Sequence, residues 1–209
     1  MATSDLELRV AWQRYVAAGP AGEAALEALL RRHSGPGRHY HDVRHVRWVV
    51  RHVLELTERF DDTVEDPGAV VAAAFFHDAV YGGTDDERQS ADLAVRTLSD
   101  LGWARGRCDL VAELVLATDH RSPPSSRDAA VLVAADLAVL AAAPAVYGDY
   151  VRSVRKEYGR LDDTTWRTGR AEVLRGFLDR PAIFPADLGL DAWERRARAN
   201  LTAELAALR

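Results

Sequence analysis

Two long apolar segments constrain the fold of this chain more than any other feature of its sequence. Residues 69–81 and 128–142 consist almost entirely of alanine, valine, leucine and phenylalanine. A helix that is apolar on all sides is usually buried among other elements. Ionisable side chains nevertheless interrupt both segments, with His77 and Asp78 in the first and Asp136 in the second. The fold must therefore bury two apolar helices and also satisfy the polar groups that they carry.

The rest of the sequence has the pattern of a helical protein. Valine and leucine recur at helical spacing over residues 40–60, and glycine and proline separate the segments. No stretch has convincing strand alternation, a hairpin signal or an internal repeat. We predict an all-α protein with helices at residues 5–18, 21–33, 40–60, 69–81, 85–101, 105–119, 128–142, 146–158, 164–178 and 191–208.

Length and charge narrow the function. A chain of 209 residues fits one domain, which we take to span residues 1–209. The net charge of -5 argues against a general nucleic-acid coat and against a protein that binds anionic membranes. The N-terminus lacks the layout of a signal peptide, and the lone Cys108 cannot form an internal disulfide, a cysteine-based zinc ribbon or an iron–sulfur cluster. We expect a cytoplasmic protein with no nucleic-acid polymer and no membrane as partner.

The polar groups in the apolar segments admit two explanations. A divalent cation would offset the charges of Asp78 and Asp136 and accept a ring nitrogen of His77. Alternatively, His77 and Asp78 form a buried hydrogen bond while Asp136 bonds to backbone elsewhere, because structural ion pairs also occur in protein cores. Burial without any partner would be strongly unfavourable for all three groups.

A histidine-rich segment favours the first explanation. Four of the seven histidines lie between His39 and His52. On a helix, His41 and His45 would share one face about 6 Å apart, and His52 would follow two turns later. The pair could bind one metal together, or one histidine could bind metal while the other meets the substrate. The other interpretation is a solvated, partly cationic helix start; His33 and His39 are expected in loops or at the surface.

The ordered set of His45, the His77-Asp78 pair and Asp136 resembles the signature of the HD-domain phosphohydrolases. Over roughly residues 35–185 the chain is also similar to a bacterial branch of predicted metal-dependent HD phosphohydrolases. The matching stretches are Arg38-x-Tyr40-His41-x-x-x-His45, Phe76-His77-Asp78-Ala-Val-Tyr81, Asp86-Glu87-x-x-Ser90-Ala91, Ala135-Asp136-Leu137, Tyr147-x-x-Tyr150-x-x-x-Val154-Arg155-x-Glu157-Tyr158 and Gly169-Arg170-x-x-x-Leu174-x-x-Phe177-Leu178.

This resemblance implies an HD-domain helical bundle with additional N- and C-terminal helices. It also implies a divalent metal ion held by His45, His77, Asp78 and Asp136. HD proteins with two metals generally carry further histidines between the His-Asp pair and the last aspartate. Only His120 lies in that interval here, so we expect either a single ion or one ion with a second, weakly held ion bridged through Asp78.

A second resemblance concerns the roles of the two neighbouring histidines. Cyclic-nucleotide phosphodiesterases carry Tyr-His-Asn-x-x-His at the start of their site, which is similar to Tyr40-His41-Asp42-Val43-Arg44-His45 here. In that family the first histidine is the general acid and the second is a metal ligand. The resemblance therefore implies that His41 is the acid and that His45 binds metal. Asp42 stands where asparagine is usual.

The predicted donor set has its own chemistry. Two imidazoles and two carboxylates without a thiolate suit Mn, Fe, Co, Ni, Zn or Mg. Such an ion lowers the pKa of bound water towards ~7 and so generates a nucleophile. Glu87 could orient that water, although an acid at a helix start is also common without such a role. His120 could line the pocket or reach a second metal.

Arginines would hold the non-bridging oxygens of a phosphate. Arg38 and Arg155 rank first because they lie in the matching stretches, and each could instead belong to a solvated helix face. Further candidates are Arg44, Lys156 and Arg170.

The preferred function is a metal-dependent phosphohydrolase, an enzyme acting on a small phosphomonoester or phosphodiester such as a nucleotide. Motifs of nucleotide-driven motors, Rossmann dehydrogenases and serine hydrolases are missing from the sequence. Two alternatives remain open: a non-catalytic metal- or nucleotide-binding regulatory module on the same scaffold, and an iron-dependent HD oxygenase. The sequence leaves the physiological substrate and the oligomeric state open.

Overall fold

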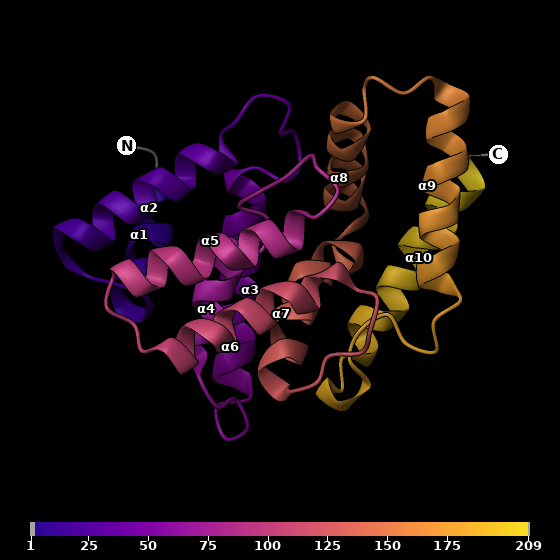
Figure 1. Cartoon of the computed structure of the whole chain (residues 1–209). Helices are drawn as coiled ribbons and strands as arrows, with labels where there is room; N and C mark the ends of the chain where they lie inside the picture. The colour runs from indigo at the N-terminus through magenta and orange to yellow at the C-terminus, as the bar shows by residue number, and fades with distance from the viewer. Residues whose placement is uncertain (1–2, 209) are drawn as a thin grey trace. The chain divides into compact units, whose positions relative to one another are not determined.

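The computed structural model describes residues 3–208, and every regular element within that range is a helix (Figure 1). The all-α prediction is therefore confirmed. The contacts of the chain fall into two compact units, Met1–Asp136 and Leu137–Arg209, which are described separately below. The prediction of a single domain over residues 1–209 stays a prediction.

The first unit contains six helices, a 3-10 turn and nearly all of α7. These elements are α1 (Thr3–Tyr15), α2 (Gly19–His33), α3 (Val43–Arg59), α4 (Pro67–Phe76), α5 (Asp86–Asp100), α6 (Arg105–Leu116), η1 (Ala117–Asp119) and α7 (Arg127–Leu137). The second unit contains η2 (Ala138–Ala141), α8 (Pro144–Glu157), α9 (Asp163–Leu178), η3 (Ala186–Leu188) and α10 (Asp191–Ala207).

Helix α4 is the centre of the first unit. All of its residues except the first are buried, and it packs against α1, α3, α5 and α6. Its start is fixed by Asp66, whose carboxylate accepts a hydrogen bond from the Ala69 N–H at 2.9 Å and pairs with Arg107 Nε at 2.6 Å. Asp128 of α7 accepts hydrogen bonds from two backbone N–H groups just before α4, at 2.8 and 3.0 Å. Capping and ion pairing therefore determine where this apolar helix begins.

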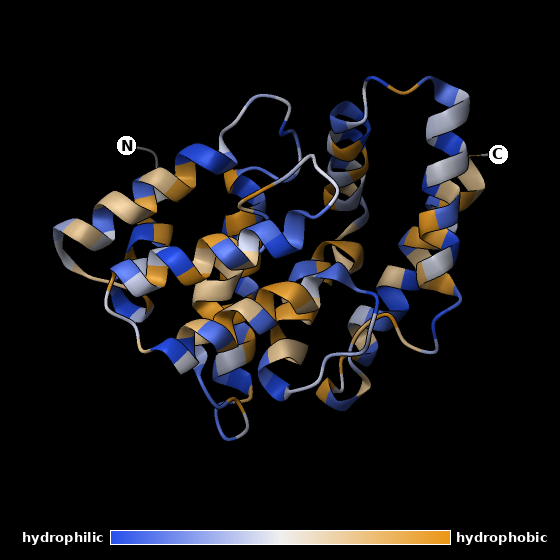
Figure 2. Ribbon diagram, viewed as in Figure 1, coloured by the Kyte–Doolittle hydropathy of each residue, from blue (hydrophilic) through white to orange (hydrophobic). Residues whose placement is uncertain are grey.

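Helix α7 is the second apolar element. It is predominantly hydrophobic (Figure 2), and its residues from Ala129 to Ala135 are buried. Asp136 follows directly, one residue before the helix ends at Leu137. Both segments that the sequence marks as apolar thus form buried helices, but the predicted helix over residues 128–142 ends as an α-helix at Leu137 and is followed by the 3-10 helix η2.

Helix α4 is shorter than the predicted helix over residues 69–81. It ends at Phe76, so that His77 and Asp78 lie at and beyond its C-terminus. The turn that follows is held by distant side chains. Arg38 donates to two of its backbone carbonyls at 2.8 and 3.2 Å, and Ser90 Oγ accepts from one of its N–H groups at 3.0 Å. These bonds replace the ones that would have continued the helix.

Helix α3 begins later than predicted. Its first residue is Val43, and Asp42 caps it by accepting a hydrogen bond from the Arg44 N–H at 2.8 Å. Aspartate is favoured at this position because its carboxylate satisfies an otherwise unpaired N–H group. His41 therefore precedes the helix, and the prediction that His41 and His45 share a helix face is wrong.

The second unit has a buried ionic network. The guanidinium of Arg170 in α9 donates from Nε to Glu204 Oε1 at 2.8 Å and from Nη2 to Glu204 Oε2 at 3.0 Å. Glu204 of α10 also accepts a hydrogen bond from the Tyr147 hydroxyl, and Arg170 Nη2 donates to the Tyr150 hydroxyl at 3.1 Å. Arg170 is only 7% exposed. The Arg170 guanidinium is buried and bonded to Glu204 and Tyr150. We therefore no longer consider Arg170 a candidate ligand for phosphate.

Within residues 3–208 no individual helix combines the length and the apolar character needed to cross a membrane. Only the broken pair Arg127–Ala141 and Pro144–Glu157 reaches that length and composition, and only when its two parts are added together.

Candidate metal centre

Four side chains from three segments of the first unit converge on one point. His45 lies in the first turn of α3, His77 and Asp78 follow α4, and Asp136 comes from the end of α7. The Nε2 atoms of the two histidines are 2.9 Å apart, and each lies 3.2 Å from Asp78 Oδ2. Asp136 Oδ1 is 3.3 Å from His45 Nε2 and 3.6 Å from His77 Nε2. The structure brings together the four residues that the sequence singled out, and their role as metal ligands stays a prediction.

The spacing of these atoms fits the ligands of a single metal ion. Nitrogen and oxygen ligands lie about 2.1 Å from a transition metal or zinc. Two such ligands are then about 3.0 Å apart when they subtend a right angle at the ion and about 3.4 Å apart in a tetrahedral site. The observed separations of 2.9 to 3.6 Å lie within about 0.2 Å of these values. One ligand atom each from His45, His77 and Asp78 lies within 4.8 Å of the others.

The carboxylates and the imidazoles of the cluster shift one another's pKa values. Burial would lower the pKa of His77, but the charge of Asp78 and hydrogen bonds to Asp136 and Asp78 outweigh it, so the pKa lies well above its usual range. Burial would raise the pKa of Asp78, but the charge of His77 and hydrogen bonds from both imidazoles hold it well below its usual range. The same pattern lowers the pKa of Asp136. Two ionised carboxylates are thus balanced by protons on the imidazoles, and a divalent ion could take the place of those protons.

The two imidazoles are oriented by different means. His77 Nδ1 lies 3.0 Å from the carbonyl of Ala74, so an Nδ1–H donates there and Nε2 keeps its lone pair for a metal. His45 Nδ1 is buried without a hydrogen-bond partner. The His45 ring instead packs against Tyr40, with ring centroids 4.8 Å apart. Each histidine therefore presents Nε2 to the cluster, although only His77 has the hydrogen bond that usually fixes a metal-binding ring.

His41 lies beside the cluster without joining it. Its ring centroid is 5.5 Å from that of His45, and it stacks on Tyr81 at 4.4 Å with an interplanar angle of 29°. His41 and His45 are therefore close together, as predicted, but His41 lies in the turn before α3 and not on the helix. Whether His41 acts as an acid stays a prediction.

Arg38 connects the two segments of the centre. Its Nη1 atom donates to the carbonyl of His41 at 2.7 Å and to that of Asp78 at 2.8 Å. Its guanidinium also lies over the Tyr81 ring, 5.3 Å from the centroid. These contacts hold the turn that bears Asp78 against the segment before α3. The predicted role of Arg38 in binding phosphate stays a prediction.

His120 reaches the centre from the end of η1. Its Nε2 atom is 2.9 Å from Asp136 Oδ2, whereas Asp136 Oδ1 faces the imidazole pair. His120 also has a left-handed backbone, with φ of 56°. The proposal that His120 lines the pocket or reaches a second metal is untested, but the residue is in direct contact with a candidate ligand.

The structure does not test the predicted roles of Glu87 in orienting water and of Arg155 in binding phosphate. Glu87 is half-buried in the first turn of α5, one turn before Ser90, whose hydroxyl contacts the turn after α4. Arg155 belongs to the second unit. There it donates to Asp163 Oδ1 at 2.8 Å and to two backbone carbonyls in the connection between α8 and α9.

Sequence reasoning missed the supports of the turn that carries Asp78. The carboxylate of Asp86 accepts hydrogen bonds from the N–H groups of Gly82 and Gly83 at 2.7 and 2.9 Å. Gly82 has a φ of 97°, a conformation that favours glycine. Together with Ser90, Asp86 ties the turn to α5. The signal was present in the matching stretch Asp86-Glu87-x-x-Ser90, to which sequence reasoning gave no structural role.

The prediction that His33 lies in a loop or at the surface is wrong. It is fully buried at the end of α2, and its Nε2 atom lies 3.1 Å from the carbonyl of Phe75. Burial, with smaller effects of nearby cations, lowers its pKa to about 3. The spacing of Leu26, Leu29 and His33 on one helix face could have indicated burial. His39, by contrast, is exposed as predicted.

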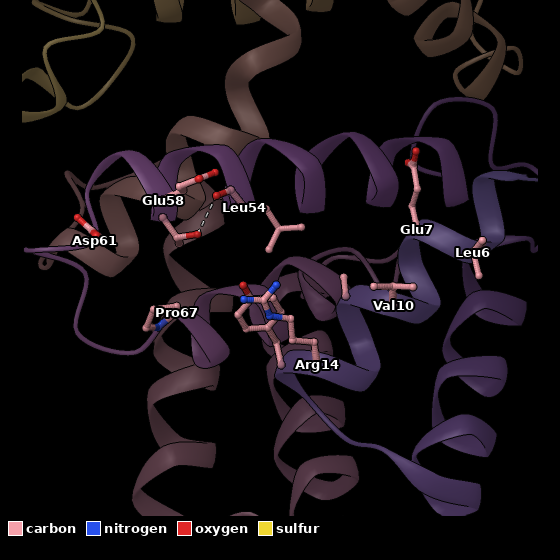
Figure 3. A pocket seen from close by; sticks show the side chains of 11 residues that line it. Leu6, Glu7, Val10, Arg14, Leu54, Glu58, Asp61 and Pro67 are labelled. Atoms are coloured by element: carbon pink, nitrogen blue, oxygen red, sulfur yellow. Dashed lines mark hydrogen bonds between the residues drawn. The ribbon is translucent and has the colours of Figure 1, made fainter.

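A separate surface groove of about 760 Å³ lies between α1, the C-terminal part of α3 and the start of α4 (Figure 3). Leu6, Val10 and Leu54 contribute apolar surface, and three acids in the lining outnumber Arg14. None of the four clustered residues lines it. An apolar and acidic groove does not suit a phosphate, so we do not assign the substrate to it.

Comparisons with models of protein families, with curated proteins and with solved structures find no match to this chain.

Proposed function

We propose that the protein is a metal-dependent phosphohydrolase that acts on a small phosphomonoester or phosphodiester, such as a nucleotide. One observation carries the proposal. His45, His77 and Asp78, from distant parts of the chain, each bring a ligand atom within 4.8 Å of the others, and Asp136 Oδ1 lies 3.3 and 3.6 Å from the two imidazole Nε2 atoms. The proposed ligands are His45, His77, Asp78 and Asp136. Mixed nitrogen and oxygen donors without thiolate favour Mn, Fe, Co, Ni, Zn or Mg.

A bound divalent ion would polarise the phosphoryl group and lower the pKa of a bound water towards ~7. The residues of the chain supply the remaining functions. His41, beside the centre, would hold a proton on its ring and deliver it to the oxygen of the leaving group. Glu87 would orient the attacking water. Arg38 would hold phosphate oxygens, which arginine does well because its donors are arranged as a fork.

Metal analysis and a phosphoester screen test this proposal together. The purified protein is dialysed, its metal content is measured, and turnover is followed on nitrophenyl phosphates, phosphodiesters and nucleotides with and without chelator. We expect about one ion per chain and a hydrolysis that chelator abolishes. His52→Ala is a matched control, because His52 lies in the same helix α3 and its ring bonds to the carbonyl of Trp48 outside the cluster. This variant should keep both metal and turnover.

Other outcomes identify the alternatives. Stoichiometric metal without turnover of any phosphoester would favour a binding or regulatory module. Oxygen consumption by the iron-loaded protein would favour an oxygenase. A protein that binds no metal would reject the proposal. Partners other than a small phosphorylated substrate are not required by it, and a cytoplasmic location remains a prediction.

A further inference from the structure

The two oxygens of Asp136 have different neighbours. Oδ1 lies 3.3 Å from His45 Nε2, on the side of the candidate metal, whereas Oδ2 lies 2.9 Å from His120 Nε2. A carboxylate held at both oxygens cannot rotate without losing one of these contacts. The direction of Oδ1 is therefore coupled to the position of the His120 ring.

The backbone of His120 has an unusual conformation. Its φ of 56° and ψ of 18° are left-handed, and no other residue except glycine has a positive φ between residues 3 and 208. Glycine adopts this conformation most readily, because it lacks a Cβ atom. Residues held in such regions often cluster at functional sites, where the surrounding structure maintains them. A histidine here suggests that its side chain is needed at this place.

The turn around His120 is independently fixed. The hydroxyl of Thr118 donates to the carbonyl of Val115 at 2.7 Å, and Asp119 Oδ1 accepts from the N–H of Arg121 at 2.8 Å. The His120 side chain is only 18% exposed. The chain before and after His120 is thus anchored by local bonds, and the ring points at Asp136 from a rigid support.

We infer that His120 is a positioning residue that holds Asp136 with Oδ1 directed at the ion and thereby sets the metal affinity of the centre. The inference rests on the proposed metal centre but not on the reaction that it catalyses. Partners that hydrogen-bond to metal ligands typically contribute 10–100-fold to metal affinity. We expect His120 to contribute an effect of this size.

A second metal ion offers a competing explanation. His120 Nε2 and Asp136 Oδ2 are 2.9 Å apart, which is also a separation that two ligands of one ion could have. Stoichiometry separates the two explanations. A positioning residue leaves the number of bound ions at one in the wild type and in variants of His120, whereas a ligand of a second ion makes the number fall from two to one.

The experiment compares three variants of the full chain, His120→Ala, His120→Gly and His120→Gln. Affinity for Co²⁺ and Zn²⁺ is measured by competition with a chromophoric chelator, and unfolding of the metal-free proteins is followed by circular dichroism. We expect Ala and Gly to weaken binding by about 10–100-fold. The Gln variant places an amide N–H₂ near the position of Nε2. Its metal affinity should stay within a few-fold of that of the wild type.

The Gly variant separates positioning from a structural role. It removes the ring and also relieves the left-handed backbone, so its metal-free form should be at least as stable as that of the Ala variant. Its metal affinity should nevertheless fall as far as that of the Ala variant. A purely structural role would instead let Gly retain the wild-type affinity.

Three results would overturn the inference: unchanged affinity in both the Ala and Gly variants, a change in stoichiometry from two ions to one, or equal weakening in the Gln and Ala variants. A wild type that binds neither Co²⁺ nor Zn²⁺ would also overturn it. Failure of the proposed function has a different signature. A wild type that binds metal but hydrolyses no phosphoester rejects the enzyme, while the affinities of the three variants still decide the role of His120.

Discussion

The protein buries two polar clusters, one in each unit, and they solve the problem of buried charge differently. The cluster in the second unit is complete in itself. Arg170 and Glu204 pair through two nearly parallel hydrogen bonds of 2.8 and 3.0 Å, and two tyrosine hydroxyls bond to them. The cluster in the first unit places His45 Nε2 and His77 Nε2 only 2.9 Å apart, beside two carboxylates.

The difference shows what distinguishes a structural ion pair from a candidate site. The fork of Arg170 matches the carboxylate of Glu204 in both charge and geometry, so nothing further is needed. Two ring nitrogens that face each other can share at most one proton between them, so this pair alone balances only one of the two carboxylates. A divalent ion at their centre would satisfy all four groups at once. Buried charge alone therefore does not indicate function, whereas buried donors aimed at a common point do.

The largest effect is expected when one of the proposed ligands of the first cluster is removed. His45→Ala should lose bound metal and reduce phosphoester turnover to background, because one of four ligands is removed. Metal content after dialysis and turnover on nitrophenyl phosphate measure this. The control is His52→Ala, on the same helix. Wild-type metal content in His45→Ala would show that His45 is not a ligand.

A smaller effect is expected from the neighbouring histidine. His41→Ala should retain the metal and lower turnover by about 10²–10⁴-fold, the usual contribution of a general acid. The loss should shrink for substrates with a good leaving group such as nitrophenolate, which needs little protonation. The measurement compares kcat/KM on nitrophenyl and alkyl phosphates. Near wild-type rates on both substrates would reduce His41 to a packing residue, and metal loss equal to that of His45→Ala would show that the pair chelates together.

The third prediction compares the two clusters directly. Glu204→Ala leaves the buried Arg170 without its partner and should lower the free energy of unfolding by about 3–5 kcal/mol, whether or not metal is present. Asp136→Ala should remove bound metal and lose about 2.7 kcal/mol of stability, but only at metal concentrations near 100 times the wild-type Kd. Without metal its effect should be small or even stabilising, because a buried charge is deleted.

Urea unfolding of both variants with metal and with chelator measures these differences. A loss of stability in Asp136→Ala that is the same under both conditions would make the first cluster a structural network like the second. Metal content equal to wild type in this variant would remove Asp136 from the ligands.

The sequence predicted the cluster of the first unit because its members are conspicuous. His77, Asp78 and Asp136 interrupt segments that are otherwise apolar, and burial of such segments forces their polar groups to find partners. The network of Arg170 and Glu204 has no such signal. Both residues lie in helices with many charged neighbours, and only tertiary packing decides which of those charges is buried.

The boundaries of the helices near the centre were missed for a related reason. The end of α4 at Phe76 depends on Arg38 and Ser90, which lie far from it in the chain and bond to the turn that follows. Local periodicity cannot contain that information. The start of α3 is different, because an aspartate directly before the helix is a local signal and Asp42 could have been recognised as its cap.

The smallest effect concerns a buried polar group that belongs to neither cluster. His33 is fully buried, and burial lowers its pKa from 6.5 to about 3, so the folded protein keeps it neutral at acidic pH while the unfolded chain takes up a proton. A lowered pKa contributes stability that is present above the unfolded pKa and is lost as the pH falls through the range from 6.5 towards 3. Between pH 6.5 and about pH 4.5 this loss amounts to about 2 kcal/mol.

His33→Gln should remove this dependence, because glutamine does not titrate and its amide can still donate to the carbonyl of Phe75. Urea unfolding at pH 7 and pH 4.5, with chelator present so that metal binding does not contribute, gives the stability loss of each protein. We expect the wild type to lose about 2–3 kcal/mol more than the variant over this interval. All other acids and bases are common to both proteins and cancel in the difference. Parallel losses would mean that His33 is protonated in the folded state, and that the cluster beside it, rather than His33, governs the acid sensitivity of the first unit.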